Sequence, residues 1–478
     1  MRTQKKCGNC PALRVDVHKL WRALAAAAVI TACVSAFAAG QSQAPAQALA
    51  QPSAPAPGQV PAQAPGIQLP PAPVPAVPQV PPAAHLSLDR AIELALQHNH
   101  ALLAARTTID QNRAAEITAN LRPNPVLLGD ALFIPVFQPS NFTGDYMEQN
   151  AQFDLGVSYL FERGRKRQHR LEAARDQTAV TTATVADNER TLTSNVAVQF
   201  INALLAKSNL SLAQEDLGSY QQTVQISESR YQAGAMSEGD LLKIKLQLLQ
   251  FQMDLNQAQL AEVQALANLR QLVGFESIPE NYDVDGDLTY QPLHLNLDDL
   301  KLQALRTRPD YRAAQLGVTA AQSQYTLMRA NGKRDPTLEF NYTHIYGLSL
   351  GSFFFNVQMP IFDRNQGEIA RARFAVTGAQ EQQIAASEGV ISDVVNAYEN
   401  MRTNDQIVSL YTSGYLKEAE DSRTISEYAF QRGAASLLDY LDAERSYRAT
   451  ELAYRQALAS YMLGLEQLRQ AVGTRSLP

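Results

Sequence analysis

The chain has 478 residues, which is enough for two or three ordinary domains. Its formal net charge is −6, and no basic patch interleaved with aromatic residues is present, so nucleic-acid binding is not expected. Beyond the N-terminal region no apolar run reaches the length of about 18 residues that a membrane helix needs, so no transmembrane helix is expected there.

Residues 1–38 have the features of an export signal. A basic segment precedes an apolar run, and the small residues up to Ala38 suit a signal peptidase. A second interpretation is that Cys33, in "ITAC", is the acylated cysteine of a bacterial lipobox. The sequence leaves both interpretations open. Cleavage after Ala38 would remove every cysteine, which suits an oxidising periplasm; the three cysteines are Cys7, Cys10 and Cys33.

Residues 39–84 are rich in proline, alanine and glutamine and carry almost no charge. Such a segment cannot bury a core, so we expect an extended, polyproline-like linker. At about 3.1 Å per residue it would reach on the order of 100 Å.

The remaining chain is a duplication. "NLRQLVG" at 268–274 recurs as "QLRQAVG" at 467–473, an offset of 473 − 274 = 199, and Gly234 and Asp240 map onto Gly433 and Asp439 with the same offset. We therefore predict two repeats, each with the order helix, strands, long helix, break, helix. The expected segments are repeat 1 at 85–274, a linker at 275–294, repeat 2 at 295–473 and a tail at 474–478.

Four segments of about ten residues have strand character. Apolar and polar residues alternate strictly over 152–161, clearly over 338–346, and less cleanly over 353–362 and 124–135. Each is long enough for a tilted strand to cross a bilayer. A soluble sheet with one wet face is the alternative. The clustering of aromatic residues in these segments favours the membrane.

Very long helices follow the strands. From about Gly164 to Arg230 there is no proline, and apolar residues recur every seven positions: Val196, Ala203, Leu210, Leu217, Val224 and Tyr231. A helix of about 65 residues is roughly 100 Å long. Similar spacing runs from Ile391 to Tyr415, and shorter partner helices are expected at 240–273 and 439–472. Glycine-containing breaks turn the chain back between the long and the short helices.

Four membrane strands cannot stand alone, because an open sheet leaves unpaired backbone groups in lipid. A dimer would supply eight strands and a trimer twelve, and a lumen of the latter size can hold water. The fold class expected is therefore mainly α with a small β part, in an oligomer that closes a barrel.

The duplication, the order of elements and "GAASLLDYLDA" resemble TolC-type outer-membrane efflux proteins over residues 85–473. "RPNP" at 122–125 and "FERGRKR" at 161–167 resemble the CzcC-like heavy-metal branch. The resemblance implies a homotrimer with a twelve-stranded β-barrel and a long periplasmic α-helical coiled-coil barrel, in the outer membrane of a Gram-negative-type bacterium. It also implies a periplasmic adaptor (a membrane fusion protein) and an inner-membrane pump of RND, ABC or MFS type as partners. No catalytic residue, cofactor or metal site is expected.

The resemblance also assigns a periplasmic gate. Two acids at this motif, matched by Asp439 and Asp442, ring the closed tunnel entrance, and Asp240 is the corresponding acid of repeat 1. Six carboxylates from three copies would favour cations and raise one another's pKa values. The alternative for Asp439 is a helix-capping role, which would explain one acid but not two.

In the family this tip is also where the adaptor docks, which points to the turn residues Gly234, Ser237, Gly433 and Ser436. A glycine at a helix break is equally expected for its backbone freedom alone. The chain departs from the family pattern at Phe430 and Ala435, which stand where a tyrosine and an arginine help to hold the closed state. Neither side chain can make those polar bonds, so other contacts must hold the tip.

The predicted function is a passive, gated exit duct of a tripartite efflux or type I secretion system, carrying metal ions, drugs or protein. The alternative is a structural periplasmic coiled-coil protein or an adaptor without a pore. An adaptor would show one helical hairpin beside a β-rich lipoyl-like domain, whereas this sequence has two hairpin units, each with membrane-length strands.

Overall fold

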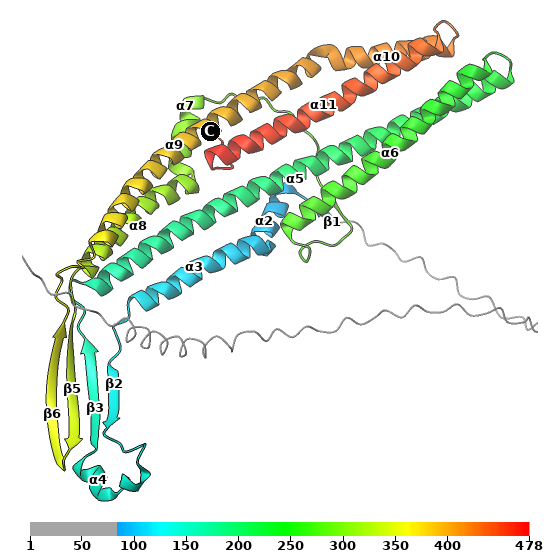
Figure 1. Ribbon diagram of the computed structural model, residues 1–478. Helices are drawn as coiled ribbons and strands as arrows, with labels where there is room; N and C mark the ends of the chain where they lie inside the picture. The colour runs from blue at the N-terminus through cyan, green and yellow to red at the C-terminus, as the bar shows by residue number, and fades with distance from the viewer. Residues whose placement is uncertain (1–83, 478) are drawn as a thin grey trace, which may run out of the picture. The chain divides into compact units, whose positions relative to one another are not determined.

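The computed structural model describes residues 84–477. The expected export signal, Cys33 and nearly all of the 39–84 linker lie outside the described residues. Figure 1 shows long helices running side by side, with four strands at one end of the helices and two helical hairpin tips at the other.

Each half of the described chain has the predicted order of elements. The first half consists of β1 (Ala84–Leu86), α2 (Leu88–His98), α3 (His100–Ala119), β2 (Val126–Leu132), α4 (Gly144–Gln149), β3 (Gln152–Leu160), α5 (Lys166–Gln232), α6 (Glu238–Val273) and β4 (Tyr282–Val284). The second consists of α7 (Leu297–Thr307), α8 (Pro309–Asn331), β5 (Pro336–Ile345), β6 (Leu348–Val357), α9 (Gln366–Leu410), a π-helical turn (Tyr411–Tyr415), α10 (Leu416–Gln431) and α11 (Leu437–Val472).

The first helix of each half is split in two, which the sequence analysis did not predict. Asn99 ends α2, and its side chain caps α3 by accepting from the backbone N–H of Leu102 at 3.0 Å. In the second half Pro309 begins α8, where its missing N–H costs nothing because first-turn N–H groups have no helical partner.

The long helix of the first half is confirmed: α5 runs for 67 residues without interruption. It packs against α3, α6, α8 and α11. One stretch of α5 is apolar and long enough to cross a membrane by composition alone, but half of that stretch is buried against its neighbours, as expected of a packed helix.

The long helix of the second half differs from the expectation of a continuous coil. Gly414, with φ 140°, interrupts it within the π-helical turn between α9 and α10. Val394, Met401 and Val408 are buried as predicted, whereas Tyr415, just past the break, is exposed. A π-helical turn changes the angular position of the residues that follow it, so heptad positions beyond the turn no longer face the neighbouring helix.

The four longer strands form one antiparallel sheet in the order β2-β3-β5-β6. Strand β6 lies about five residues earlier than the predicted 353–362. Tyr346 and Gly347 have φ values of 54° and 71°, which suit a two-residue hairpin turn, so β6 begins directly at Leu348. Pro360 cannot donate to a strand ladder, and the segment around it connects to α9 instead.

The sheet has one apolar face and one face that is polar along its two central strands. Register places Val157 opposite Phe340, and Phe340 opposite Phe353, and the rings of the two phenylalanines lie 5.0 Å apart. These side chains are exposed in the single chain, with 47% of Val157 accessible. On the other face β3 and β5 carry polar side chains, among them Asp154, Ser158, Glu339, Asn341 and Thr343. The edge strands β2 and β6 add Asp130 and Ser352 to this face, together with the apolar Leu128, Leu132, Leu350 and Phe354. The strand alternation predicted from the sequence is thus confirmed.

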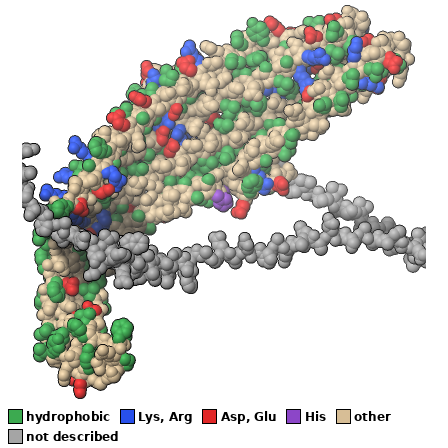
Figure 2. Space-filling model, viewed as in Figure 1, with side chains coloured by type: hydrophobic (Ala, Val, Ile, Leu, Met, Phe, Trp, Pro, Cys, Tyr) green, Lys and Arg blue, Asp and Glu red, His purple; other side chains and the backbone are tan. Residues whose placement is uncertain are grey.

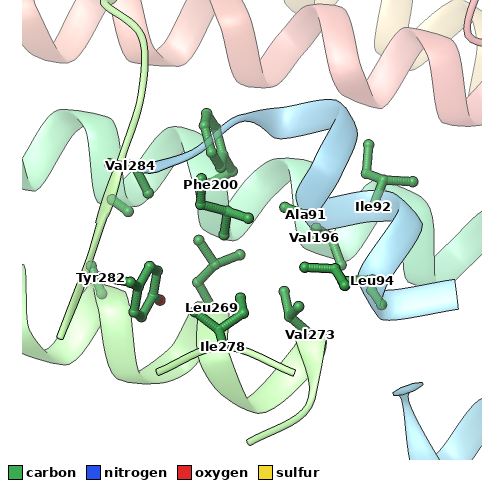
Figure 3. Close-up of a cluster of buried hydrophobic side chains, with 14 of the residues drawn as sticks. Ala91, Ile92, Leu94, Val196, Phe200, Leu269, Val273, Ile278, Tyr282 and Val284 are labelled. Atoms are coloured by element: carbon green, nitrogen blue, oxygen red, sulfur yellow. The ribbon is translucent and has the colours of Figure 1, made fainter. Parts of the chain in front are cut away.

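Two hydrophobic clusters, one in each half, pack the C-terminal parts of α6 and α11 against the long helices. In Figure 3, Ala91 and Leu94 of α2 face Val196 and Phe200 of α5, with Leu269 of α6 closing the cluster. The second half has its own cluster of α7, α9 and α11 residues, including Leu300, Val394, Tyr461 and Leu468. Each repeat therefore has its own core, as a duplication predicts.

Candidate gate at the hairpin tips

The two hairpin tips have the same backbone. Each long helix ends with glycine in left-handed conformation, Gly234 at φ 71° and Gly433 at φ 73°. The following N–H groups bond back to the last helical turn, from Ala235 to the Arg230 carbonyl and from Ala434 to the Ala429 carbonyl, both at 2.8 Å. Glycine is needed because a Cβ disfavours this conformation.

Ser237 and Ser436 cap the return helices. The Ser237 hydroxyl accepts from the Asp240 N–H at 3.1 Å, and the Ser436 hydroxyl accepts from the Asp439 N–H at 3.2 Å. Asp439 also accepts from the Ser436 backbone N–H at 3.2 Å, which completes a reciprocal capping box. In the single chain, Asp439 therefore has the helix-capping role that the sequence offered as the alternative to a gate.

The hydrogen bonds at the tips favour the ionised form of these two acids. Hydrogen bonds from Ser237 and then Lys243 lower the pKa of Asp240, and bonds from the Ser436 hydroxyl and backbone lower the pKa of Asp439. Both carboxylates are therefore ionised at neutral pH. This lowering of the pKa is opposite to the rise in pKa expected when carboxylates stand together in a ring. Such a ring would require all three copies of the chain.

Asp442 is not part of the cap. It lies one turn into α11, is exposed, and its side chain has no hydrogen bond or ion pair with any described residue. Its counterpart in repeat 1 is position 442 − 199 = 243, which is Lys243. Lys243 pairs with Asp240 at 3.2 Å. At the first tip Lys243 thus pairs with Asp240 and leaves Glu238 unpaired among the described residues, whereas at the second tip neither Asp439 nor Asp442 has a paired cation.

A hydrophobic cluster joins the two tips within one chain. Tyr220 of α5 stacks on Phe251 of α6, and Phe430 of α10 stacks on Tyr440 of α11 with ring centroids 5.2 Å apart. The hydroxyls of Tyr440 and Thr223 lie 3.2 Å apart, linking α11 to α5. Burial raises the pKa of Tyr440 to about 12, so this hydroxyl keeps its proton.

Arg230 fastens the second tip to the first. Its guanidinium donates to the carbonyl of Phe430 at 3.2 Å and to the carbonyl of Gln431, and lies 5.4 Å from the centre of the Phe430 ring. Arg230 therefore joins the ends of the two hairpins, at a tip where neither Phe430 nor Ala435 can offer a polar side chain. Sequence reasoning missed Arg230, because its repeat-2 counterpart is Ala429 and carries no matching signal.

A buried ion cluster lies further along the same hairpins. Arg448 of α11 pairs with Asp216 of α5 at 3.2 Å and with Asp254 of α6 at 2.5 Å. Arg423 of α10 pairs with Glu444 of α11 at 3.5 Å. Asp216 is 5% exposed and Glu444 7%, and burial raises the pKa of both carboxyls. Sequence reasoning missed this cluster too, because its residues come from four helices.

The sheet is the second part of the passage. Within the described chain β2 and β6 each pair on one side only, so the sheet has two open edges. Its exposed apolar face suits lipid, and its polar face with Asp130, Asp154 and Glu339 suits water. This is the arrangement of one segment of a closed membrane barrel.

A sheet with one lipid-compatible face, joined to a duplicated set of long helices that end in capped tips, defines an outer-membrane channel subunit. The family profile "Outer membrane efflux protein" matches residues 91–275 and 301–474, so the chain belongs to that family. The fold class and the efflux-channel function expected from the sequence are confirmed, and the alternative of a pore-less coiled-coil protein or adaptor gains no support. Members are transport channels, trimeric in the outer membrane, that work with a periplasmic adaptor and an inner-membrane pump.

Characterised relatives include a metal-resistance protein and a cation efflux protein. The chain is 25% identical over 381 residues to the cobalt-zinc-cadmium resistance protein CzcC of Cupriavidus metallidurans, covering 78% of this chain and 86% of the relative. It is 28% identical over 276 residues to the cation efflux system protein CusC of Escherichia coli, covering 54% and 59%.

Solved structures show the same fold. A CusC crystal structure matches with a TM-score of 0.67 at 22% identity, covering 81% of this chain and 92% of that one. The outer membrane protein VceC of Vibrio cholerae matches with a TM-score of 0.65 at 20% identity, covering 81% and 96%.

Proposed function

We propose that this channel is the exit duct of a metal-exporting efflux system and that its second hairpin tip is the cation-selective constriction. The observation that carries the proposal is the charge at that tip, where Asp439 and Asp442 stand one turn apart with no cation paired to either among residues 84–477. Three copies would bring six such carboxylates around one opening. Rings of acidic side chains favour cations.

The rest of the passage supports a cationic cargo. Asp130, Asp154 and Glu339 share the polar face of the sheet, which would line the barrel lumen in a closed trimer. Similarity to CzcC and CusC points to the same class of cargo. Drugs and secreted proteins are the competing cargoes, and neither requires acids at both ends of the duct.

The turn residues Gly234, Ser237, Gly433 and Ser436 are proposed as the contact for the periplasmic adaptor. Both turns lie at the free ends of the hairpins, so they are the first part of the helical region that a partner from the inner membrane would meet (Figure 1). The glycines also have the backbone role described above, so substitutions that test docking should change exposed side chains such as Glu238 instead.

We also propose the segment boundaries derived from the repeats. Residues 1–38 are proposed as an export signal that is cleaved off together with Cys33, and acylation of Cys33 is the alternative. We also propose that the chain performs no catalysis and that the inner-membrane pump supplies the energy.

The test is a deletion strain grown on divalent cobalt, zinc, cadmium and copper, and on a panel of hydrophobic drugs and dyes. We expect sensitivity to one or more metals, restored by the wild-type gene but less well by a D439N/D442N variant. A strain complemented with D299N, which changes an exposed acid on α7, is the matched control. Sensitivity to drugs and dyes alone, or no change at all, would contradict a metal-exporting role.

A further inference from the structure

A band of basic side chains lies where the strands meet the helices. Figure 2 shows Lys and Arg side chains gathered at this junction. Six of them form no ion pair with any residue in 84–477: Arg122, Arg163, Arg165, Arg167, Lys333 and Arg364. The carboxylates of the junction are already engaged, in the pairs Glu162–Arg170, Asp335–Lys166 and Asp363–Arg334. The band therefore keeps a positive excess.

The band is continuous with the lipid-compatible face of the sheet. Tyr159 and Phe161 belong to the apolar alternation of β3 and its extension, and 48% of Phe161 is exposed. The same two residues line an open pocket of about 430 Å³ together with Arg122, Arg165 and Arg167. A molecule seated there would place an apolar part against the aromatic rings and an anionic part against the arginines.

Arg165 occupies a backbone position that does not favour arginine. It is the residue before α5 and has φ 60°, in the left-handed region. The residue before α9 in the second half, Asn365, has φ 63°, and asparagine tolerates this region better than residues with long side chains. The first half thus keeps a guanidinium at a position where asparagine would satisfy the fold with less strain.

We propose that this basic band binds the headgroups of anionic phospholipids in the periplasmic leaflet of the outer membrane. The helices extend into the periplasm, so the junction lies at the level of that leaflet's phosphates. Two features decide for a lipid over a soluble anion: the basic residues border an exposed apolar face, and aromatic rings share the pocket with the arginines. The binding anchors the subunit at a fixed depth and is independent of the cargo.

The test uses the purified full-length trimer and native mass spectrometry, with phosphatidylglycerol and phosphatidylcholine of the same chain length. The wild type should retain phosphatidylglycerol preferentially. Each basic residue near an anionic lipid surface contributes on the order of a fivefold change in affinity. R165N should therefore weaken retention about fivefold while preserving the trimer, because asparagine suits the backbone. R122Q/R167Q should weaken it by tenfold or more.

The matched control is R306Q/R312Q, which removes two exposed arginines that form no ion pair among the described residues. Arg306 lies on α7, and Arg312 lies near the start of α8, at the end of that helix away from the strands. It should retain phosphatidylglycerol as the wild type does. Equal retention of both lipids by the wild type would overturn the proposal, as would an unchanged preference in R165N and R122Q/R167Q. Displacement of phosphatidylglycerol by millimolar inorganic phosphate would also overturn it, by showing a site for free phosphate.

Discussion

The two hairpin tips share a backbone and differ in charge and in support. Both have a left-handed glycine, a capping serine and a first-turn aspartate. The first tip pairs its aspartate with Lys243 and ends an unbroken helix, whereas the second has Asp442 at the matching position and follows the break at Gly414. Duplication thus preserved the residues that the turn requires and left the others free to diverge.

The difference indicates that the two hairpins have different roles. The first hairpin makes two sets of contacts with the second. Arg230 of α5 donates a hydrogen bond to the end of α10, and Asp216 and Asp254 form ion pairs with Arg448 of α11. The second hairpin carries the excess negative charge. The first hairpin thus supports the second, which carries the unpaired acids of the proposed gate.

The largest effect should follow from removing the central cation of that support. In Arg448→Ala, Asp216 and Asp254 lose their shared partner, and Asp216 remains buried without an ion pair. Breaking a buried ion pair in this way costs about 3 kcal/mol or more. Thermal unfolding followed by circular dichroism should show a clearly lower midpoint. Arg445→Ala, an exposed arginine on the same helix, should leave the midpoint nearly unchanged, and equal effects would contradict the assignment.

A smaller effect on stability and a visible effect on gating are expected for Arg230→Ala. The variant loses two charge-assisted hydrogen bonds to the second tip, worth about 1–2 kcal/mol because the site is partly exposed. Planar-bilayer recordings should show more frequent or longer openings than the wild type. Arg432→Ala removes an arginine of the second tip that does not bridge the hairpins and should gate normally. Unchanged openings in Arg230→Ala would show that the tips are held elsewhere.

The smallest effect concerns pH. Burial raises the pKa of Glu444 and Asp216, so the folded state holds these protons more tightly than the unfolded state. Their contribution to stability is fully present below the unfolded pKa and is lost as pH rises through the raised folded pKa. Between pH 7 and pH 5 the wild type should therefore gain more in unfolding midpoint than Glu444→Gln. The same pH response in both proteins would exclude Glu444 as the titrating group.

Much of the fold could be predicted because it rests on local patterns. The heptads of α5, the alternation of β3 and the repeated turn signals are each readable within one segment, and the constant offset between the halves ties the segments together. The boundary of β6 was placed too late because the turn uses Tyr346 in a left-handed conformation, which an aromatic residue does not signal. The break at Gly414 was missed because one glycine does not by itself end a helix.

The residues of the candidate gate also differ in whether a local sequence pattern reveals them. Asp439 and its capping serine belong to one short motif and could be found from it, together with Asp442. Arg230, Arg448 and Asp216 act across helices that only the fold brings together, and none has a repeat partner of the same type. Contacts between hairpins require a three-dimensional structure.

The most direct test of the central claim is the ion selectivity of the channel with and without the unpaired acid of the second tip. Reversal potentials would be measured in planar bilayers under a salt gradient for the wild type, Asp442→Asn and the control Asp299→Asn. We expect cation preference in the wild type and in Asp299→Asn, and a shift toward zero potential in Asp442→Asn. A reversal potential unchanged by Asp442→Asn would contradict the assignment of the second hairpin tip as the selective constriction.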